Sequence, residues 1–99
     1  MVRPTSARTR LAAGTVGEHL LVWRKLHGLT AAQVAERAGI SRGTLRKIET
    51  GELGVGLEAF LNVAKALGVL DLLVQALDPY ETELGRARAD QTLPQRVRR

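Results

Sequence analysis

Apolar positions recur at helical spacing along the chain, and glycines separate most of the apolar segments from one another. The pattern predicts a helix over residues 15–27, two short helices over 30–38 and 42–50, and a fourth over 57–67. A fifth segment, residues 70–77, is almost wholly apolar. We therefore expect an all-α fold: a compact bundle of about five helices with a flexible N-terminal arm and a C-terminal helical or tail extension.

The beginning of the chain lacks this periodicity, and we expect a flexible basic arm over residues 1–14. Thr15 and Glu18 then form a T-x-x-E capping box that predicts the start of the first helix. Its inward stripe consists of Val16, Leu20 and Trp23. These boundaries divide the chain into the arm, a helical domain over 15–69 and an extension over 70–99.

The two short helices have clear start and stop signals. Thr30 and Gln33 form a second capping box, and Gly39 occupies the position where a helix commonly ends in a left-handed conformation. Ser41 is the N-cap of the next helix, and Leu45 and Ile48 are its inward residues. The spacing predicts two helices joined by a tight turn.

The outward positions of the second short helix carry cations and small residues. They are Arg42, Gly43, Thr44, Arg46 and Lys47. A helix that is apolar on one side and basic on the other fits the DNA major groove, and the Arg42 fork suits guanine O6 and N7. Gly43 weakens the helix. Two explanations for a glycine here are open: it lets the backbone approach DNA closely, or it is the result of simple sequence drift.

Residues 16–69 resemble the phage-repressor (XRE) family of helix-turn-helix proteins. The matching positions are Arg24, Gly28-Leu29-Thr30, Val34-Ala35, Ala38-Gly39-Ile40-Ser41, Leu45, Ile48-Glu49, Leu57-Glu58 and residues 63–69. The resemblance implies double-stranded DNA as partner, a structural ion pair between Arg24 and Glu49, and phosphate contacts from Thr30, Gln33, Ser41 and Thr44. Family members often carry Gln directly after the opening Thr, where this chain has Ala31.

The extension suggests a second chain as partner. Its apolar residues exceed what a small core easily hides, and we expect a homodimer. The predicted seam is Val69, Leu70, Leu73, Val74 and Leu77. The alternative is that these residues close the protomer's own core. Leu53 and Val55, in a glycine-rich loop, are further candidates for a protein contact.

The last third of the chain has its own start signal, Asp78-Pro79, which predicts a charged sixth helix ending near Ala89. The residues from Leu93 onward fit either a short strand or a disordered tail. This third contains DPYET at residues 78–82, LGRARAD at 84–90 and LPQRVR at 93–98. With these segments it resembles the HipB-like regulators that accompany HipA-type serine/threonine kinases. That resemblance implies an antitoxin role with the kinase as partner.

Composition narrows the function further. The chain has no Cys and two His, so we expect no metal, no cofactor and no enzymatic activity. The formal net charge of +5 favours a polyanionic partner. Neither a membrane span nor an apolar signal segment is evident, and we expect a cytoplasmic, nucleoid-associated protein. Two functions remain open: a DNA-binding repressor, and an interaction module that chiefly restrains a protein partner.

Overall fold

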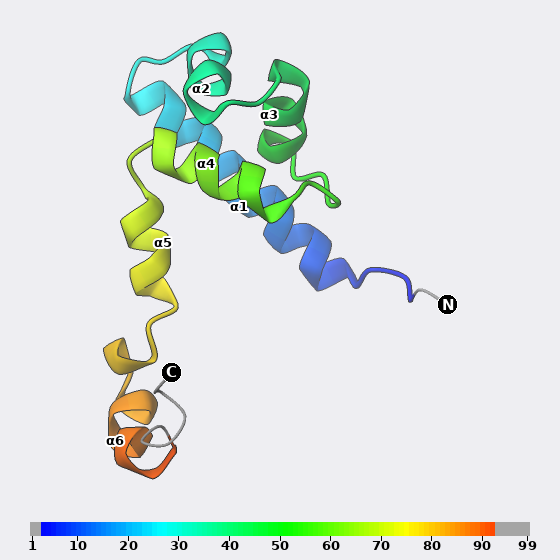
Figure 1. Cartoon of the computed structure of the whole chain (residues 1–99). Helices are drawn as coiled ribbons and strands as arrows, with labels where there is room; N and C mark the ends of the chain where they lie inside the picture. Colours follow the sequence, from blue (N-terminus) through cyan, green and yellow to red (C-terminus); the bar gives the residue numbers. More distant parts are fainter. Residues whose placement is uncertain (1–2, 93–99) are drawn as a thin grey trace.

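The computed structural model describes residues 3–92, with side chains described up to residue 89, and this part of the chain is all helical (Figure 1). The α-helices are α1 (Ala7–Leu26), α2 (Ala31–Ala38), α3 (Arg42–Glu49), α4 (Leu57–Ala66), α5 (Leu70–Ala76) and α6 (Glu83–Thr92), with a 3₁₀ helix, η1 (Pro79–Glu81), between the last two. The predicted all-α class is confirmed. The expectations for residues 93–99 lie outside the described residues.

Helix α1 begins eight residues earlier than the sequence predicted, so the prediction of a flexible arm over residues 1–14 is wrong from residue 7 onward. Ser6, not Thr15, is the N-cap, and its hydroxyl accepts a hydrogen bond from the Thr9 backbone N–H at 3.1 Å. The residues that follow are mostly Ala, Arg and Leu, which are strong helix formers. The T-x-x-E signal therefore lies inside a continuous helix.

Two glycines of α1 mark the place where α3 crosses it. A Cβ atom on Gly17 would overlap with the backbone carbonyl oxygens of Ile48 and Glu49, at the end of α3. One on Gly51 would likewise overlap with the backbone of Gly14. The C-terminal end of α3 thus lies directly on the backbone of α1, and larger side chains at these positions would move it away.

The core lies among α1, α2, α3 and α4, which together form the body of the molecule (Figure 1). Its largest fully buried side chains are Leu45, Leu67, Val34 and Val63. Val16, which the sequence assigned to the inward stripe of α1, is instead exposed, and so is Leu57 at the start of α4, although it continues the apolar spacing of that helix. Both line a surface hollow next to the α3–α4 loop, so their apolar character is not explained by the core.

The residues after Val69 extend away from the body as α5, η1 and α6, called here the C-terminal extension (Figure 1). Its shape gives the Cα trace a radius of gyration of 16.6 Å, compared with about 13 Å for a compact chain of 100 residues. Asp78 is an N-cap as predicted, but it caps η1, and its carboxylate accepts the Tyr80 N–H at 2.9 Å. Helix α6 begins later because the Thr82 hydroxyl accepts the Gly85 N–H and starts a new helix.

Candidate nucleic-acid interface

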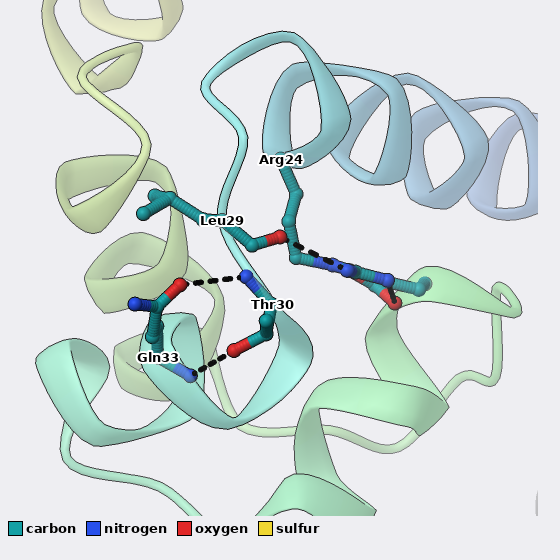
Figure 2. Close-up of polar contacts among 5 residues, drawn as sticks. Arg24, Leu29, Thr30 and Gln33 are labelled. Carbon is teal, nitrogen blue, oxygen red and sulfur yellow. Dashed lines mark hydrogen bonds and ion pairs between the residues drawn. The ribbon is translucent and has the colours of Figure 1, made fainter.

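Helix α2 is held at both ends by its own residues. The Thr30 hydroxyl accepts the Gln33 backbone N–H at 3.1 Å, and the Gln33 side-chain oxygen accepts the Thr30 N–H at 2.9 Å (Figure 2). At the other end Gly39 has φ 71°, a left-handed conformation that costs glycine little. The capping box and the stop predicted from the sequence are both present, and they fix the direction in which the chain enters the turn.

The turn leads directly into α3, whose first turn is also capped by a side chain. The Ser41 hydroxyl accepts the Thr44 N–H at 3.0 Å and donates to the Thr44 hydroxyl at 3.0 Å. Ile40 is half-buried beside the core. The hydroxyls of Ser41 and Thr44 therefore already serve α3 itself, while both residues remain at its solvent-facing end.

Helix α3 separates its apolar and basic side chains completely. Leu45 and Ile48 are buried in the core. The outward residues form what we call the basic face: Arg42, Gly43, Arg46 and Lys47, all exposed, and Thr44, half-buried at its edge. Among the side chains that the structure describes, no carboxylate forms an ion pair with these three cations. The positive charge of the basic face is thus available to a polyanion.

An ion pair anchors the C-terminal end of α3, at the two positions for which the family resemblance implied one. Arg24 Nε donates to Glu49 Oε2 at 2.8 Å, and Arg24 Nη2 donates to Glu49 Oε1 at 3.2 Å. The remaining nitrogen, Nη1, donates to the Leu29 carbonyl at 3.2 Å, so one guanidinium joins α1, α3 and the chain entering α2 (Figure 2). The two side chains are only 15% and 10% exposed, so each charge depends on the other for solvation.

The hydrogen bonds of Gln33 limit what it can offer to a ligand. Its oxygen is used by the capping box, but the amide nitrogen, which points away from Thr30 in Figure 2, keeps its donor protons. Between the start of α2 and the first two turns of α3 lies a hollow of about 360 Å³, lined by Ala31, Gly43, Arg42 and Arg46 among others. Ala31 at the start of α2 and Gly43 in the first turn of α3 therefore leave open space beside the basic face.

The predicted dimer residues fall into three groups. Val69 is buried in the protomer's own core, so its assignment to an exposed seam is wrong. Leu70 and Leu73 are half-buried against the core, because α5 packs on α4 through this side. Val74 and Leu77 are exposed. Leu72, Tyr80 and Leu84, which the apolar pattern did not assign to the seam, are also exposed. The helical period of α5 places Leu72 opposite Leu70 and could have indicated its exposure.

The described part of the chain offers neither a metal site nor a membrane-spanning helix. No group of three or more His, Asp or Glu side chains there is placed to hold a metal ion. No described helix combines the length and the apolar character needed to cross a membrane.

Two capped helices joined by a left-handed glycine, with the second one basic outside and apolar inside, define a helix-turn-helix. Residues 21–73, more than half of the chain, match the family model described as Helix-turn-helix. The chain therefore belongs to the XRE-type helix-turn-helix family and is a DNA-binding transcription regulator of that type. Comparisons with curated proteins and with solved structures gave no match.

Proposed function

We propose that the protein is a sequence-specific repressor that binds an inverted-repeat operator as a homodimer and controls its own gene. The basic face of α3 carries the proposal, because its three cations lack ion-pair partners among the described side chains. A basic helix held rigidly at both ends is suited to read base edges in the major groove. Regulation would then follow from occupying promoter DNA in the cytoplasm, without any chemical step.

The position of each residue along α3 suggests its role. Arg42 lies in the first turn, the part of a recognition helix that comes nearest to base edges, and its fork matches guanine O6 and N7. Arg46 and Lys47 lie one turn later and are placed for phosphates on either side of the groove. Thr30, Gln33, Ser41 and Thr44 supply further donors at the two helix starts.

Gly43 gives independent support for close approach to DNA. Its φ is not in the left-handed region, and a Cβ atom there would meet only Ser41 Oγ, at 3.7 Å. The folded chain therefore has no need for glycine at this position, although glycine costs a helix interior about 1 kcal/mol relative to alanine. Close approach of a bound duplex to the α3 backbone would explain why glycine occupies this position.

A dimer is proposed because one short recognition helix contacts too few base pairs for operator-level affinity. The exposed Val74 and Leu77 of the C-terminal extension supply apolar surface for such a contact. A footprint on the DNA upstream of the gene tests the proposal. We expect two protected half-sites, related by a two-fold axis and one helical turn apart, about 34 Å. Uniform protection along the fragment would contradict it.

A second candidate function is that of a HipB-like antitoxin. It is favoured by exposed apolar residues that lie outside α3, such as Leu53, Leu72 and Leu84, together with the HipB-like pattern of the last third. Coexpression with the product of the adjacent gene tests it. A stable complex with a HipA-type kinase would support the antitoxin role, and separate elution of the two proteins would contradict it.

A further inference from the structure

The C-terminal extension contains helices that have little to pack against in one protomer. Helix α6 packs on η1, where Gly85 lies against Pro79 and Arg86 Nη1 donates to the Tyr80 carbonyl at 2.6 Å. Its ten residues are fewer than an isolated helix needs for stability in water. The extension also exposes Leu72, Val74 and Leu77 on α5 and Leu84 on α6. These features indicate that another surface covers the extension.

The body has an apolar hollow that the protomer leaves open. It measures about 410 Å³ and lies between the N-terminal half of α1, the α3–α4 loop and the start of α4. Ala12, Val16, Leu53, Leu57 and Phe60 are among its lining residues. Leu57, at its rim, is 70% exposed. An apolar hollow of this size has room for more than one large aliphatic side chain.

The charges of the two surfaces are complementary. From residue 3 to residue 17, the chain carries Arg3, Arg8 and Arg10 and no acidic residue, and Thr9 between the last two arginines lines the hollow. From residue 66 to residue 85, it carries only acidic charges. They are Asp71, Asp78, Glu81 and Glu83. Glu52 also lines the hollow, and Arg86 and Arg88 lie on α6. The side of the hollow thus carries three cations against one anion, and the described side chains of the extension carry four anions against two cations, so the two surfaces are opposite in net charge.

We propose that the C-terminal extension of one protomer docks in the α1 hollow of a second copy, and that the second copy reciprocates about a two-fold axis. The protomer's own extension does not fill its own hollow, because the extension and the N-terminal half of α1 leave the body in different directions (Figure 1). In such an exchange the hollow of each copy holds the extension of the other copy. The hollow and the extension are then covered in both protomers, and the dimer is closed. The inference rests on the homodimer of the proposed function and specifies its contact.

The charges argue against the simpler dimer in which two extensions pair side by side. That arrangement would bring together two copies of a surface whose described side chains include four anions, Asp71, Asp78, Glu81 and Glu83, against two cations, Arg86 and Arg88. Like charges opposed across an interface disfavour association, whereas the exchange opposes surfaces of opposite net charge. The two arrangements predict different results for charge reversal, which makes them separable by experiment.

The test uses two charge-reversed variants of the full chain, analysed by sedimentation at physiological salt. The first, Arg8→Glu/Arg10→Glu, makes the border of the hollow acidic; the second, Glu81→Lys/Glu83→Lys, makes the extension basic. All four side chains are exposed, so the fold should survive, and circular dichroism checks this. Each variant alone should dimerise about tenfold or more weakly than the parent. An equimolar mixture should restore the dimer, because both of its contacts then oppose unlike charges.

The other outcomes separate this inference from the proposed function. If the first variant dimerises as the parent does, or if the mixture stays monomeric, the exchange is wrong while a homodimer is retained. A parent protein that is monomeric at micromolar concentration and binds DNA one to one would contradict the dimer itself. Leu57→Ser, at the rim, should also weaken the dimer, whereas the equally exposed Leu26→Ser, outside the hollow, should not.

Discussion

In the body formed by α1–α4, Leu45 is 1% exposed, whereas Leu77 in the C-terminal extension is 78% exposed. Side chains cap helix starts in both regions, at Thr30 and Ser41 in the body and at Asp78 and Thr82 in the extension, while α4 and α5 each begin without one. The two regions have similar apolar content but differ in whether one copy of the chain can bury it. We infer that the body folds by itself and that the extension reaches its final environment only in an assembly.

The largest expected difference is in the stability of the monomer when one leucine of each region is truncated. Leu45→Ala should destabilise the body by about 2–5 kcal/mol, because it removes a fully buried side chain and leaves a cavity. Leu77→Ala should leave the melting temperature of the monomer unchanged and weaken only self-association. Thermal unfolding at a concentration below dimerisation measures both variants, and an equal loss of stability would show that the regions do not differ.

The next largest effect concerns the ion pair that anchors α3. Glu49→Ala should destabilise the body by up to about 3 kcal/mol, the lower end of the range for breaking buried pairs, because Arg24 loses its partner. Glu52→Ala, at an exposed carboxylate near the end of α3, is the matched control and should change little. If urea denaturation gives the same midpoint for both variants, the pair contributes no more than a surface contact.

Within the basic face, Arg42→Ala should cost about 1–3 kcal/mol of DNA-binding free energy and relax the preference at one base position in each half-site. Its side chain is exposed, so the melting temperature should not change. Arg37→Ala, also exposed but near Lys65 on the α4 side of α2, is the control and should bind as the parent does. If the parent, Arg42→Ala and Arg37→Ala proteins bind every half-site variant with equal affinity, Arg42 does not contact the DNA.

The smallest expected change is the most specific. Gly43→Ala should stabilise the body by up to about 1 kcal/mol, because alanine favours the helix and the space around its Cβ is open. The same change should weaken operator binding if the duplex reaches the α3 backbone. Melting and binding are measured on the same preparation. A variant that is more stable and binds at least as tightly would show that Gly43 has no part in DNA contact.

The α2–turn–α3 unit was predictable because its signals are local: Thr30, Gln33, Gly39 and Ser41 act on neighbours three or four residues away. The Arg24–Glu49 pair joins helices that are distant in the sequence. Its prediction came from the family resemblance rather than from the spacing of residues. The start of α1 was not predictable in this way, because Gly14 resembles a helix break in sequence. In the structure Gly14 lies inside a continuous helix, and its backbone is in close contact with Gly51: a Cβ atom on Gly51 would overlap with it, whereas one on Gly14 would meet nothing within 4 Å.

The helical pattern of the sequence also could not predict which apolar residues are exposed. Val16 and Leu57 have inward spacing, yet they are exposed and line the α1 hollow. In the proposed exchange, a second copy of the chain covers them. Burial by a second copy leaves the same periodic signature as burial in one's own core. A sequence pattern therefore identifies such residues as apolar positions without showing which chain covers them.

The central claim is that the basic face of α3 reads a particular DNA sequence. The most direct measurement compares the affinity of the parent protein for the DNA upstream of its gene with that for a scrambled duplex of the same composition, at physiological salt. We predict tighter binding to the upstream DNA by about a thousandfold or more, as base contacts add to phosphate contacts. Equal affinities for the two duplexes would show that α3 contacts only phosphates, and would contradict the account.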